Sequence, residues 1–384
     1  MNNENLFSII DFGSSKLRLG VYGNYLQNSK YISEENLKYN FNEDTKEKSD
    51  DVNLSNTLEK LILNTESEIN QHLKNITLLV DTPRSYSLDI SIKKKLDKIN
   101  LDEKIIKNLV NEAKILIENQ YNRSKIMHLI ISKYILDGKE YEIIPQNMIV
   151  DELIVELKFI LIPNSIVTNL RSYFKKKHIT INNIYNSSYI KSLHYKKYFE
   201  QFDIKVFLDI GFNKTSLIAY KNNKIFYINY IPIGGAHITK DISKIFKINL
   251  EKSEEIKQSL KQSNLTFLND DSSKDLLIKV IHSRVEEIID LSLKNLKNFE
   301  FIGNYKSVLI FTGYGSRILS KNSIYLKKQY DVFEDMNFFE ETSDTICTSA
   351  YVYKQSDFID EVVLIPKKPK ERGLFGKLFY LFSR

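Results

Sequence analysis

Two similar stretches constrain the fold more than any other feature of this chain. Each begins with an aspartate that directly follows an apolar run and continues into a short turn. The first reads DFGSSKLRLGVYG at residues 11–23, and the second reads DIGFNKTSLIAYK at residues 209–221. Both contain D-x-G-x-x-K and continue into a second strand, a pattern typical of a β-hairpin with the acid at its tip. The two copies predict two related half-sites that face one cleft.

The length and charge of the chain restrict its class. With 384 residues, 42% of them hydrophobic, the chain is long enough for two or more cores. A formal charge of +6 from 55 basic and 49 acidic residues is modest, which argues against nucleic acid as a partner. A single cysteine, Cys347, excludes an internal disulfide and a multi-cysteine zinc site. No signal-peptide pattern or bilayer-spanning apolar run is present, so the body is expected in the cytoplasm.

Between the two hairpins the periodicity is mixed α/β. An amphipathic helix is predicted over residues 58–73, with Asn56 and Glu59 at the spacing of a capping box. From 84 to 163 the pattern changes to a strand, a helix that begins at Asp102, and two further strands. This segment is predicted to be a compact insertion between two parts of the first domain.

The second half of the chain repeats the strand pattern and then becomes helical. A helix over residues 164–177 ends in three lysines, which the helix dipole favours at a solvated C-terminus; a basic binding patch is the alternative. Asparagines 222 and 223 predict a further hairpin turn. The run SVLIFTGYGS at 307–316 predicts a buried strand that enters a glycine turn. A long helix from Ser272 is predicted to carry an apolar stripe of Leu276, Val280, Ile281, Val285, Ile288 and Ile289.

The first hairpin turn has the residues of a phosphate-binding loop. Gly13 permits close backbone approach, the amides around Ser14 and Ser15 can form an anion-binding concavity, and Lys16 adds a positive charge. Asp11 is then placed to hold a hydrated Mg²⁺, since a carboxylate would repel phosphate. An ordinary hairpin turn is the alternative interpretation of one isolated copy.

With a third strand-glycine turn, FTGYGS at 311–316, the sequence resembles the actin-like ATPase superfamily. Within it, the resemblance is strongest to the bacterial cell-division family FtsA and runs nearly end to end. Matching segments are PIGGAHITKDI at 232–242, SEEIK at 253–257 and VIHSRVEEIIDL at 280–291. The insertion at 84–163 stands where FtsA has its subdomain 1C in place of subdomain 1B of actin.

The resemblance implies an α/β, actin-like two-domain ATPase fold with an FtsA-type 1C insertion. The implied domain limits are 1–83, 164–197 and 341–360 for subdomain 1A, 84–163 for 1C, 198–240 and 304–340 for 2A, 241–303 for 2B, 361–372 for a flexible tether, and 373–384 for an amphipathic membrane-targeting helix.

The resemblance also implies ATP and Mg²⁺ as cofactors. Asp11 would hold Mg²⁺ through water, and Asp11 and Asp209 would be the candidate carboxylates for hydrolysis. Glu254 and Lys257 would contact ribose and adenine, with an exposed i, i+3 ion pair as the alternative. The nucleotide-binding residues implied are Asp11, Gly13, Ser14, Ser15, Lys16, Asp209, Gly211, Asn213, Lys214, Gly234, Gly235, Glu254, Lys257, Gly313, Gly315 and Ser316.

One departure from the family pattern concerns the second phosphate loop. The family reads D-x-G-G-G-T, whereas Phe212, Asn213 and Lys214 fill the last three places here. Lys214 can replace lost amide donors with a charge, so ATP binding can survive. A bulky Phe212 at the γ-phosphate edge is expected to disturb the attacking water, and errors of about 1 Å can cost roughly 100-fold. Slow or absent ATP hydrolysis is therefore expected.

The C-terminal stretch predicts a membrane contact. Six basic residues and one acidic residue occur from Lys367 to Arg384, and an aromatic-rich cationic helix of this kind lies in a membrane interface. The Pro-rich segment 361–372 would be a tether of at most about 40 Å. A terminal helix docked on the core is the alternative. The predicted membrane-contacting residues are Leu374, Phe375, Lys377, Leu378, Phe379, Leu381, Phe382 and Arg384.

The implied function is that of a polymerising membrane anchor, which tethers filaments of the tubulin-like protein FtsZ to the cytoplasmic face of the cell membrane at the division septum. Arg284, Glu287 and Asp290 would bind the FtsZ C-terminal peptide, although an ordinary exposed charge row has the same spacing. Other division proteins would bind the 84–163 insertion. The alternatives are a PilM-like peptide-binding adaptor of pilus assembly and, in another class, a sugar or acetate kinase.

Overall fold

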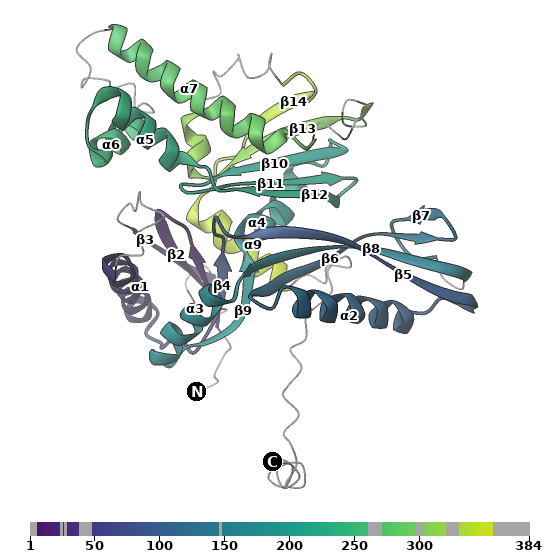
Figure 1. Ribbon diagram of the computed structural model, residues 1–384. Coiled ribbons are helices and arrows are strands. Elements are labelled where there is room, and N and C mark those ends of the chain that lie inside the picture. Colours follow the sequence, from purple (N-terminus) through teal and green to yellow (C-terminus); the bar gives the residue numbers. More distant parts are fainter. Residues whose placement is uncertain are drawn as a thin grey trace, which may run out of the picture.

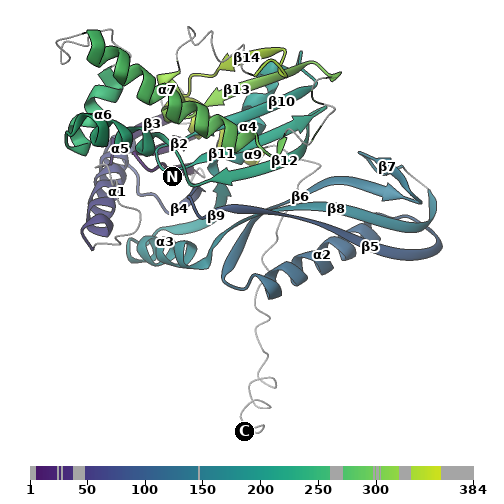
Figure 2. The same ribbon diagram turned by 45° about the horizontal axis from the view of Figure 1, so that its top comes forward.

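The computed structural model in Figure 1 describes residues 6–23, 26, 29–37, 48–145, 148–259, 271–296, 299, 302, 304–319 and 330–355. Within these residues the strands form three sheets, two of five strands and one of four. The two five-stranded sheets belong to different halves of the molecule, and the four-stranded sheet projects to one side (Figures 1 and 2).

The first five-stranded sheet is built on the predicted N-terminal hairpin. Its order is β3-β2-β1-β4-β9, and β1 is antiparallel to β2 and parallel to β4. The register places Asp11 of β1 opposite Arg18 of β2, so an acid and a base share one face of the hairpin. The strands are β1 Phe7–Phe12, β2 Lys16–Tyr22, β3 Lys30–Asn36, β4 Asn75–Val80 and β9 Thr180–Asn186.

The second five-stranded sheet repeats this arrangement, in the order β12-β11-β10-β13-β14. Strand β10 is antiparallel to β11 and parallel to β13, so both aspartate-ended stretches form the predicted hairpins. Asn222 and Asn223 have φ values of 48° and 68°, as the predicted turn between β11 and β12 requires. The strands are β10 Ile204–Ile210, β11 Thr215–Lys221, β12 Lys224–Ile231, β13 Ser307–Thr312 and β14 Asp335–Phe338.

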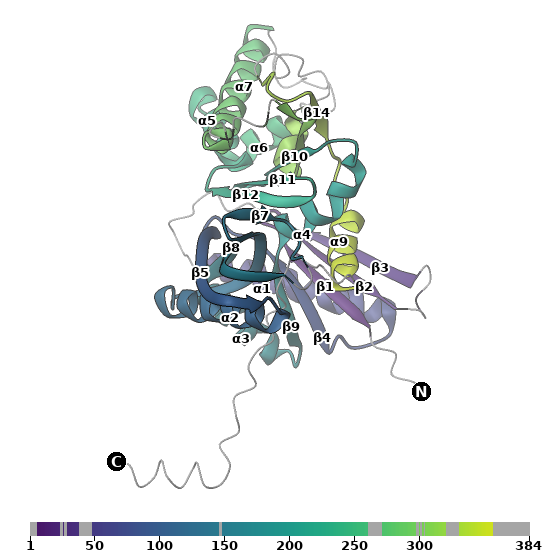
Figure 3. The same cartoon turned by 90° about the vertical axis from the view of Figure 1, so that its right-hand side faces the viewer.

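Helices cover both faces of the five-stranded sheets. Side chains of α5, α6 and α7 form one core with β10, β11 and β13, and side chains of α1 and α3 form another with the first sheet. Helices α4 and α9 lie between the two sheets and contribute to a core shared by both halves (Figure 3). The helices are α1 Lys48–Ile69, α3 Asn164–Lys176, α4 Ser187–Tyr195, η2 Lys196–Phe199, α5 Gly235–Phe246, α6 Leu250–Ser259, α7 Asp271–Leu293, η6 Tyr314–Ile318 and α9 Ser343–Gln355.

The four-stranded sheet has the order β5-β8-β6-β7, and α2 lies along one of its faces (Figure 2). The predicted helix start is confirmed, because the Asp102 side chain caps α2 by accepting from the Ile105 amide at 2.7 Å. Ser87 Oγ on β5 donates to the Ile228 carbonyl of β12 at 3.0 Å, which ties this sheet to the second half. The elements are β5 Tyr86–Asn100, α2 Glu103–Gln120, β6 Ser124–Leu136, β7 Lys139–Tyr141 and β8 Ile149–Pro163.

Two sequence-based predictions about helices are wrong. Helix α1 already begins at Lys48, so Asn56 and Glu59 lie inside the helix and do not form its capping box. Leu276 is 44% exposed. Its neighbour Leu277 takes the buried place instead, in the i, i+4 row of apolar side chains with which α7 packs against the sheet. The implied domain limits stay predictions.

Candidate functional site

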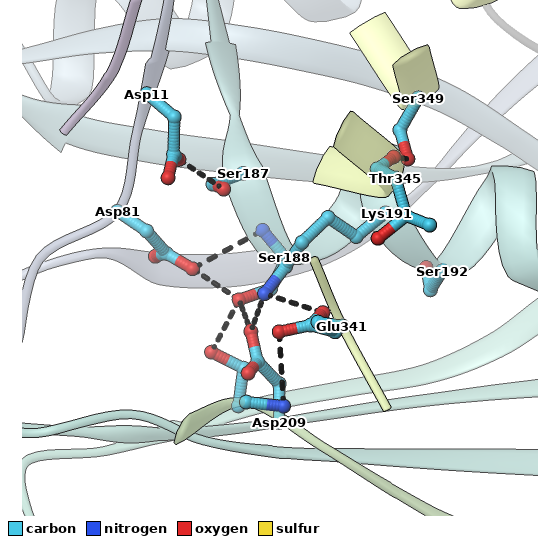
Figure 4. Close-up of polar contacts among 12 residues, drawn as sticks. Asp11, Asp81, Ser187, Ser188, Lys191, Ser192, Asp209, Glu341, Thr345 and Ser349 are labelled. Atoms are coloured by element: carbon cyan, nitrogen blue, oxygen red, sulfur yellow. Dashed lines mark hydrogen bonds and ion pairs between the residues drawn. The ribbon is translucent and has the colours of Figure 1, made fainter. Parts of the chain in front are cut away.

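Three aspartates stand at or just after the ends of parallel strands, where the two halves meet. Asp11 is in β1, Asp81 directly follows β4, and Asp209 is in β10. Ligands of α/β proteins bind at the carboxyl ends of such strands. Figure 4 shows the three carboxylates around the first turn of α4, which begins with Ser187 and Ser188.

Asp11 is paired with Arg18 inside the first hairpin. Arg18 Nη1 donates to Asp11 Oδ2 at 2.7 Å, and Ser187 Oγ donates to Asp11 Oδ1 at 2.8 Å. Burial by itself would lower the pKa of Arg18, but the Asp11 charge and the contact with Tyr314 raise it overall. The guanidinium therefore stays charged, and both oxygens of Asp11 have partners within the chain.

Asp81 is paired with Lys214 across the boundary between the two halves. Lys214 Nζ, from the β10–β11 turn, lies 2.5 Å from Asp81 Oδ2, and both side chains are 8% exposed. Asn186 Nδ2 donates to the other oxygen, Asp81 Oδ1, at 3.1 Å. Because β4 and β10 belong to different sheets, this ion pair joins them directly.

Asp209 shares a third cation, Lys191 of α4, with Glu341. Lys191 Nζ lies 2.8 Å from Asp209 Oδ2 and 3.0 Å from Glu341 Oε1. Burial by itself would lower the pKa of Lys191, but the two acids hold it well above its ordinary value. Burial works against the ionised form of Asp209, yet Lys191 and Lys214 lower its pKa, whereas burial raises the pKa of Glu341.

Ser188 connects the carboxylates of the two halves (Figure 4). Its amide donates to Asp81 Oδ2 at 3.3 Å, and its Oγ contacts Asp81 Oδ2 and lies 2.7 Å from Asp209 Oδ2. A hydroxyl carries a single hydrogen. The two carboxylates therefore also need the ammonium groups of Lys191 and Lys214.

The predicted first phosphate turn, residues 13–16, borders a cavity of about 290 Å³. Lys16 is ion-paired with Glu34 of β3, and the Ser15 carbonyl accepts from the Leu37 amide at 3.0 Å. Asn213 of the opposite hairpin also lines the cavity, whose walls are mainly apolar. The lining residues are Phe12, Gly13, Ser14, Leu37, Asn53, Leu54, Val80, Asp81, Thr82, Ile166, Leu170 and Asn213.

Glu254 and Lys257, predicted on the adenosine side, form a buried ion pair of 2.5 Å, so the alternative of an exposed pair is wrong. Lys257 Nζ also donates to the Gly235 carbonyl at 2.9 Å. Burial lowers the pKa of Lys257, although Glu254 opposes the shift. Phe212, predicted at the γ-phosphate edge, instead packs against Ala236, with the Lys257 ammonium 5.5 Å from the ring centroid.

The predicted glycines pack against the end of β10. A Cβ at Gly313, where φ is +84°, would lie 2.3 Å from Asp209 Oδ1. A Cβ at Gly234 or Gly315 would lie 2.6 or 2.8 Å from the Gly211 carbonyl oxygen. The close backbone approach that these glycines permit is therefore an approach between turns of this chain.

Tyr314 carries contacts from both halves. The Arg18 guanidinium lies 4.8 Å and the Arg317 guanidinium 3.8 Å from the centroid of its ring, which is cation–π distance. Ser316 Oγ donates to the Gly313 carbonyl at 2.7 Å and fixes this turn. A ring from the second half is thus held by an arginine of the first.

Direct ligation of Mg²⁺ by Asp11 does not fit this arrangement, whereas the predicted contact through water stays a prediction. Mg²⁺ requires a near-octahedral set of oxygen ligands, but Arg18 and Ser187 already contact both oxygens of Asp11. Lysines pair with Asp81 and Asp209 in the same way. Across the part of the chain that the structure describes, no group of three or more His, Cys, Asp or Glu side chains could hold a metal ion. ATP binding at these residues stays a prediction.

The predicted partner-binding residues lie on α7 and contact their own chain. Arg284 Nε and Nη2 donate to the two oxygens of Asp241 at 2.6 and 3.1 Å, and Arg284 Nη1 also contacts Glu287. Asp290 Oδ1 accepts from Tyr330 at 3.1 Å. Glu287 and Asp290 are exposed, so the row presents carboxylates to solvent.

The predicted tether, 361–372, and the predicted terminal helix, 373–384, lie outside the described residues. None of the helices that the structure describes is both long enough and apolar enough to cross a bilayer. The predicted membrane residues therefore stay predictions.

Six residues of the charge network are absent from the sequence-based prediction. Asp81 ends the apolar run ITLLVD, the same strand-then-acid pattern that singled out Asp11 and Asp209, so it was open to detection. Arg18 and Lys191 interrupt apolar runs with a charge, which is a weaker signal. Ser187, Ser188 and Glu341 have no local signal.

Helix α4 also carries a histidine that makes stability depend on pH. Burial, with a contribution from Lys197, lowers the pKa of His194 to about 4, whereas an unfolded histidine has a pKa of about 6.5. Below about pH 6.5 the unfolded chain gains a proton that the folded chain does not. The free energy of unfolding should therefore fall between about pH 6.5 and pH 4, by at most about 1.4 kcal/mol per pH unit. Urea denaturation at several pH values should show a shallower fall for His194→Gln; equal slopes would contradict this role.

Comparison with known proteins agrees with the sequence resemblance. Residues 206–306 match the family model described as cell division protein FtsA. Cell division protein FtsA of Bacillus subtilis is 24% identical over 188 residues, which cover 45% of this chain and 43% of that protein. FtsA of Borreliella burgdorferi is 22% identical over 244 residues, which cover 59% of this chain and 58% of that protein. The chain thus matches about half the length of these relatives.

Among solved structures, the PilM-PilN type IV pilus biogenesis complex is similar with a TM-score of 0.64. The match covers 92% of this chain and 99% of that chain at 11% identity, and at this identity it concerns the fold alone. The predicted actin-like α/β fold is confirmed. The chain is similar in sequence to cell division protein FtsA, and its fold is actin-like.

Proposed function

We propose that this chain is an FtsA-type anchor of cell division, which assembles into polymers on the cytoplasmic face of the membrane and holds FtsZ filaments there. The observation that carries the proposal is the match of residues 206–306 to the FtsA model, because this segment contains most of β10 and all of β11, β12, α5, α6 and α7. Polymerisation would multiply weak contacts of single copies with the membrane through avidity.

The FtsZ peptide is proposed to bind the row Arg284, Glu287 and Asp290 on α7. Asp241 holds the Arg284 guanidinium in a bidentate pair, which leaves one fixed cation beside the exposed carboxylate of Glu287. A row of this kind suits a peptide that carries both signs of charge, since complementary charge sets register and orientation.

Binding of a labelled FtsZ C-terminal peptide, followed by fluorescence anisotropy, tests this surface. Glu287→Lys should weaken binding of the peptide about tenfold or more. It replaces an exposed carboxylate with a positive charge, which has the same sign as the neighbouring Arg284 guanidinium. The matched control is Glu255→Lys on α6, which changes charge equally at another exposed residue. Equal affinity of the two variants for the peptide would remove α7 from the proposed interface.

The terminal segment 373–384 is proposed to be the membrane contact. Each lysine or arginine near anionic lipid contributes roughly 1 kcal/mol, and the segment adds aromatic and leucine side chains. In flotation with vesicles of anionic lipid, the full chain should rise with the vesicles and the chain lacking 373–384 should remain below. Flotation of the shortened chain to the same extent would contradict an anchor at this place.

A further inference from the structure

Lys214 lies where polar groups of the two halves contact each other. Its ammonium lies 2.5 Å from Asp81 Oδ2 and 3.4 Å from Ser188 Oγ, and it also contacts Ser216. Asp81 belongs to the first half and Lys214 to the second. One cation supplied by the chain therefore bridges oxygen atoms of both halves.

Each of the three aspartates around this point already has a cation of the chain as its partner. Asp11 pairs with Arg18, Asp81 pairs with Lys214, and Asp209 pairs with Lys191, which Glu341 shares. A divalent ion would have to displace a lysine or arginine from a buried pair, which leaves that cation uncompensated at high cost. The buried cations are Arg18, Lys191 and Lys214.

Further contacts join the halves beside this network. The ring of Tyr314, from the second half, lies 4.8 Å from the Arg18 guanidinium of the first. Helix α4 contributes both Ser187 to Asp11 and Lys191 to Asp209. The closed arrangement is thus specified by protein groups at every one of these positions.

We propose that the chain carries its own bridging cation: Lys214, supported by Lys191 and Arg18, takes the place of a divalent metal between the two halves, which close without metal or nucleotide. ATP and Mg²⁺ would then leave the closed state unchanged. A ligand shifts a conformational equilibrium only by its different affinity for the two states. This inference rests on the ion pairs alone, so it stands or falls independently of FtsZ and membrane binding.

Thermal unfolding of the wild-type full chain tests whether ATP and Mg²⁺ leave the closed state unchanged. The chain is heated with EDTA, with millimolar Mg²⁺, with ATP and EDTA, and with ATP and Mg²⁺, and equilibrium dialysis with labelled ATP is run beside it. The expected result is the same Tm in all four conditions. A Tm raised by several degrees only when ATP and Mg²⁺ are both present, together with metal-dependent retention of ATP, would overturn the proposal.

A conversion experiment tests the role of Lys214 itself. Lys214→Ala leaves Asp81 without its cation, while Asp209, connected to it through Ser188, keeps Lys191. A carboxylate without its cation is a hard oxygen ligand for Mg²⁺. The Tm of this variant in EDTA should fall by several degrees, and millimolar Mg²⁺ should restore part of the loss. The double variant Lys214→Ala, Asp81→Asn is the control, which Mg²⁺ should not restore.

Two outcomes of the conversion experiment count against the proposal. An unchanged Tm for Lys214→Ala would show that the ammonium does not join the halves. A loss that Mg²⁺ fails to restore would show that Lys214 does not stand in a metal position. If Lys214→Ala does not fold, Lys214→Arg keeps the charge, and its Tm should also ignore Mg²⁺ and ATP; a new response to Mg²⁺ would contradict the proposal.

Discussion

Gly313→Ala should destabilise the fold by about 3–5 kcal/mol, because two separate costs fall on one methyl group. The residue has a φ of +84°, and a Cβ would lie 2.3 Å from Asp209 Oδ1 and 2.5 Å from the Ile210 carbonyl oxygen. Backbone atoms of a buried strand cannot move aside cheaply. The Gly313 amide also donates to Glu341 Oε2 at 3.1 Å, so any shift disturbs the acid that shares Lys191.

Gly138 provides the matched control for this prediction. It has nearly the same backbone conformation, with a φ of +80°, but nothing lies within 4 Å of an added Cβ. Gly138→Ala should therefore cost only the conformational part, about 1 kcal/mol. Chemical denaturation of both variants separates the cost of the backbone conformation from the cost of the close contacts with β10. Similar losses of unfolding free energy for the two variants would show that the turn after β13 is not packed against β10 as described.

Lys214→Met should cost about 3–5 kcal/mol, since it leaves the carboxylate of Asp81 buried without its cation. The side chains of both partners are 8% exposed, so water cannot replace the ammonium. Asp81→Asn should also be destabilising, because it leaves the Lys214 ammonium buried without its carboxylate. The double variant Lys214→Met, Asp81→Asn should recover part of the loss, because neither partner is then an uncompensated charge.

The coupling free energy from this double-mutant cycle is the quantity to measure by chemical denaturation. Lys252→Met, at the exposed pair Lys252–Glu255 on α6, is the control and should change stability by less than about 0.5 kcal/mol. A coupling near zero for Lys214 and Asp81, with additive single losses, would mean that the two residues do not interact across the halves.

Local patterns in the sequence were sufficient for the hairpins and for the position of two acids. The strand-then-aspartate pattern placed Asp11 and Asp209 at facing strand ends, and asparagines 222 and 223 formed the expected left-handed turn. Hydrophobic periodicity and turn-forming residues are short-range signals in a sequence. The hairpins depend mainly on these local signals.

The partners of those acids could not be predicted in the same way. Arg18 opposes Asp11 through hairpin register, but the choice between an arginine and a hydrated metal depends on burial and on Ser187, far away in the sequence. Lys214 was predicted to face phosphate, yet it binds Asp81 of the other half. The hydrophobic periodicity of a sequence does not predict how two halves of a molecule are placed relative to each other. The polar start of α1 was missed because charged residues also form helices when a later apolar face packs.

Three-component flotation tests the central claim most directly. FtsZ filaments, the full chain and vesicles of anionic lipid are mixed and separated by density. We predict that FtsZ rises with the vesicles only when the full chain is present, and remains below with the Glu287→Lys variant. If the wild-type chain rises while FtsZ stays at the bottom, the chain does not connect FtsZ to the membrane and the proposed function is wrong.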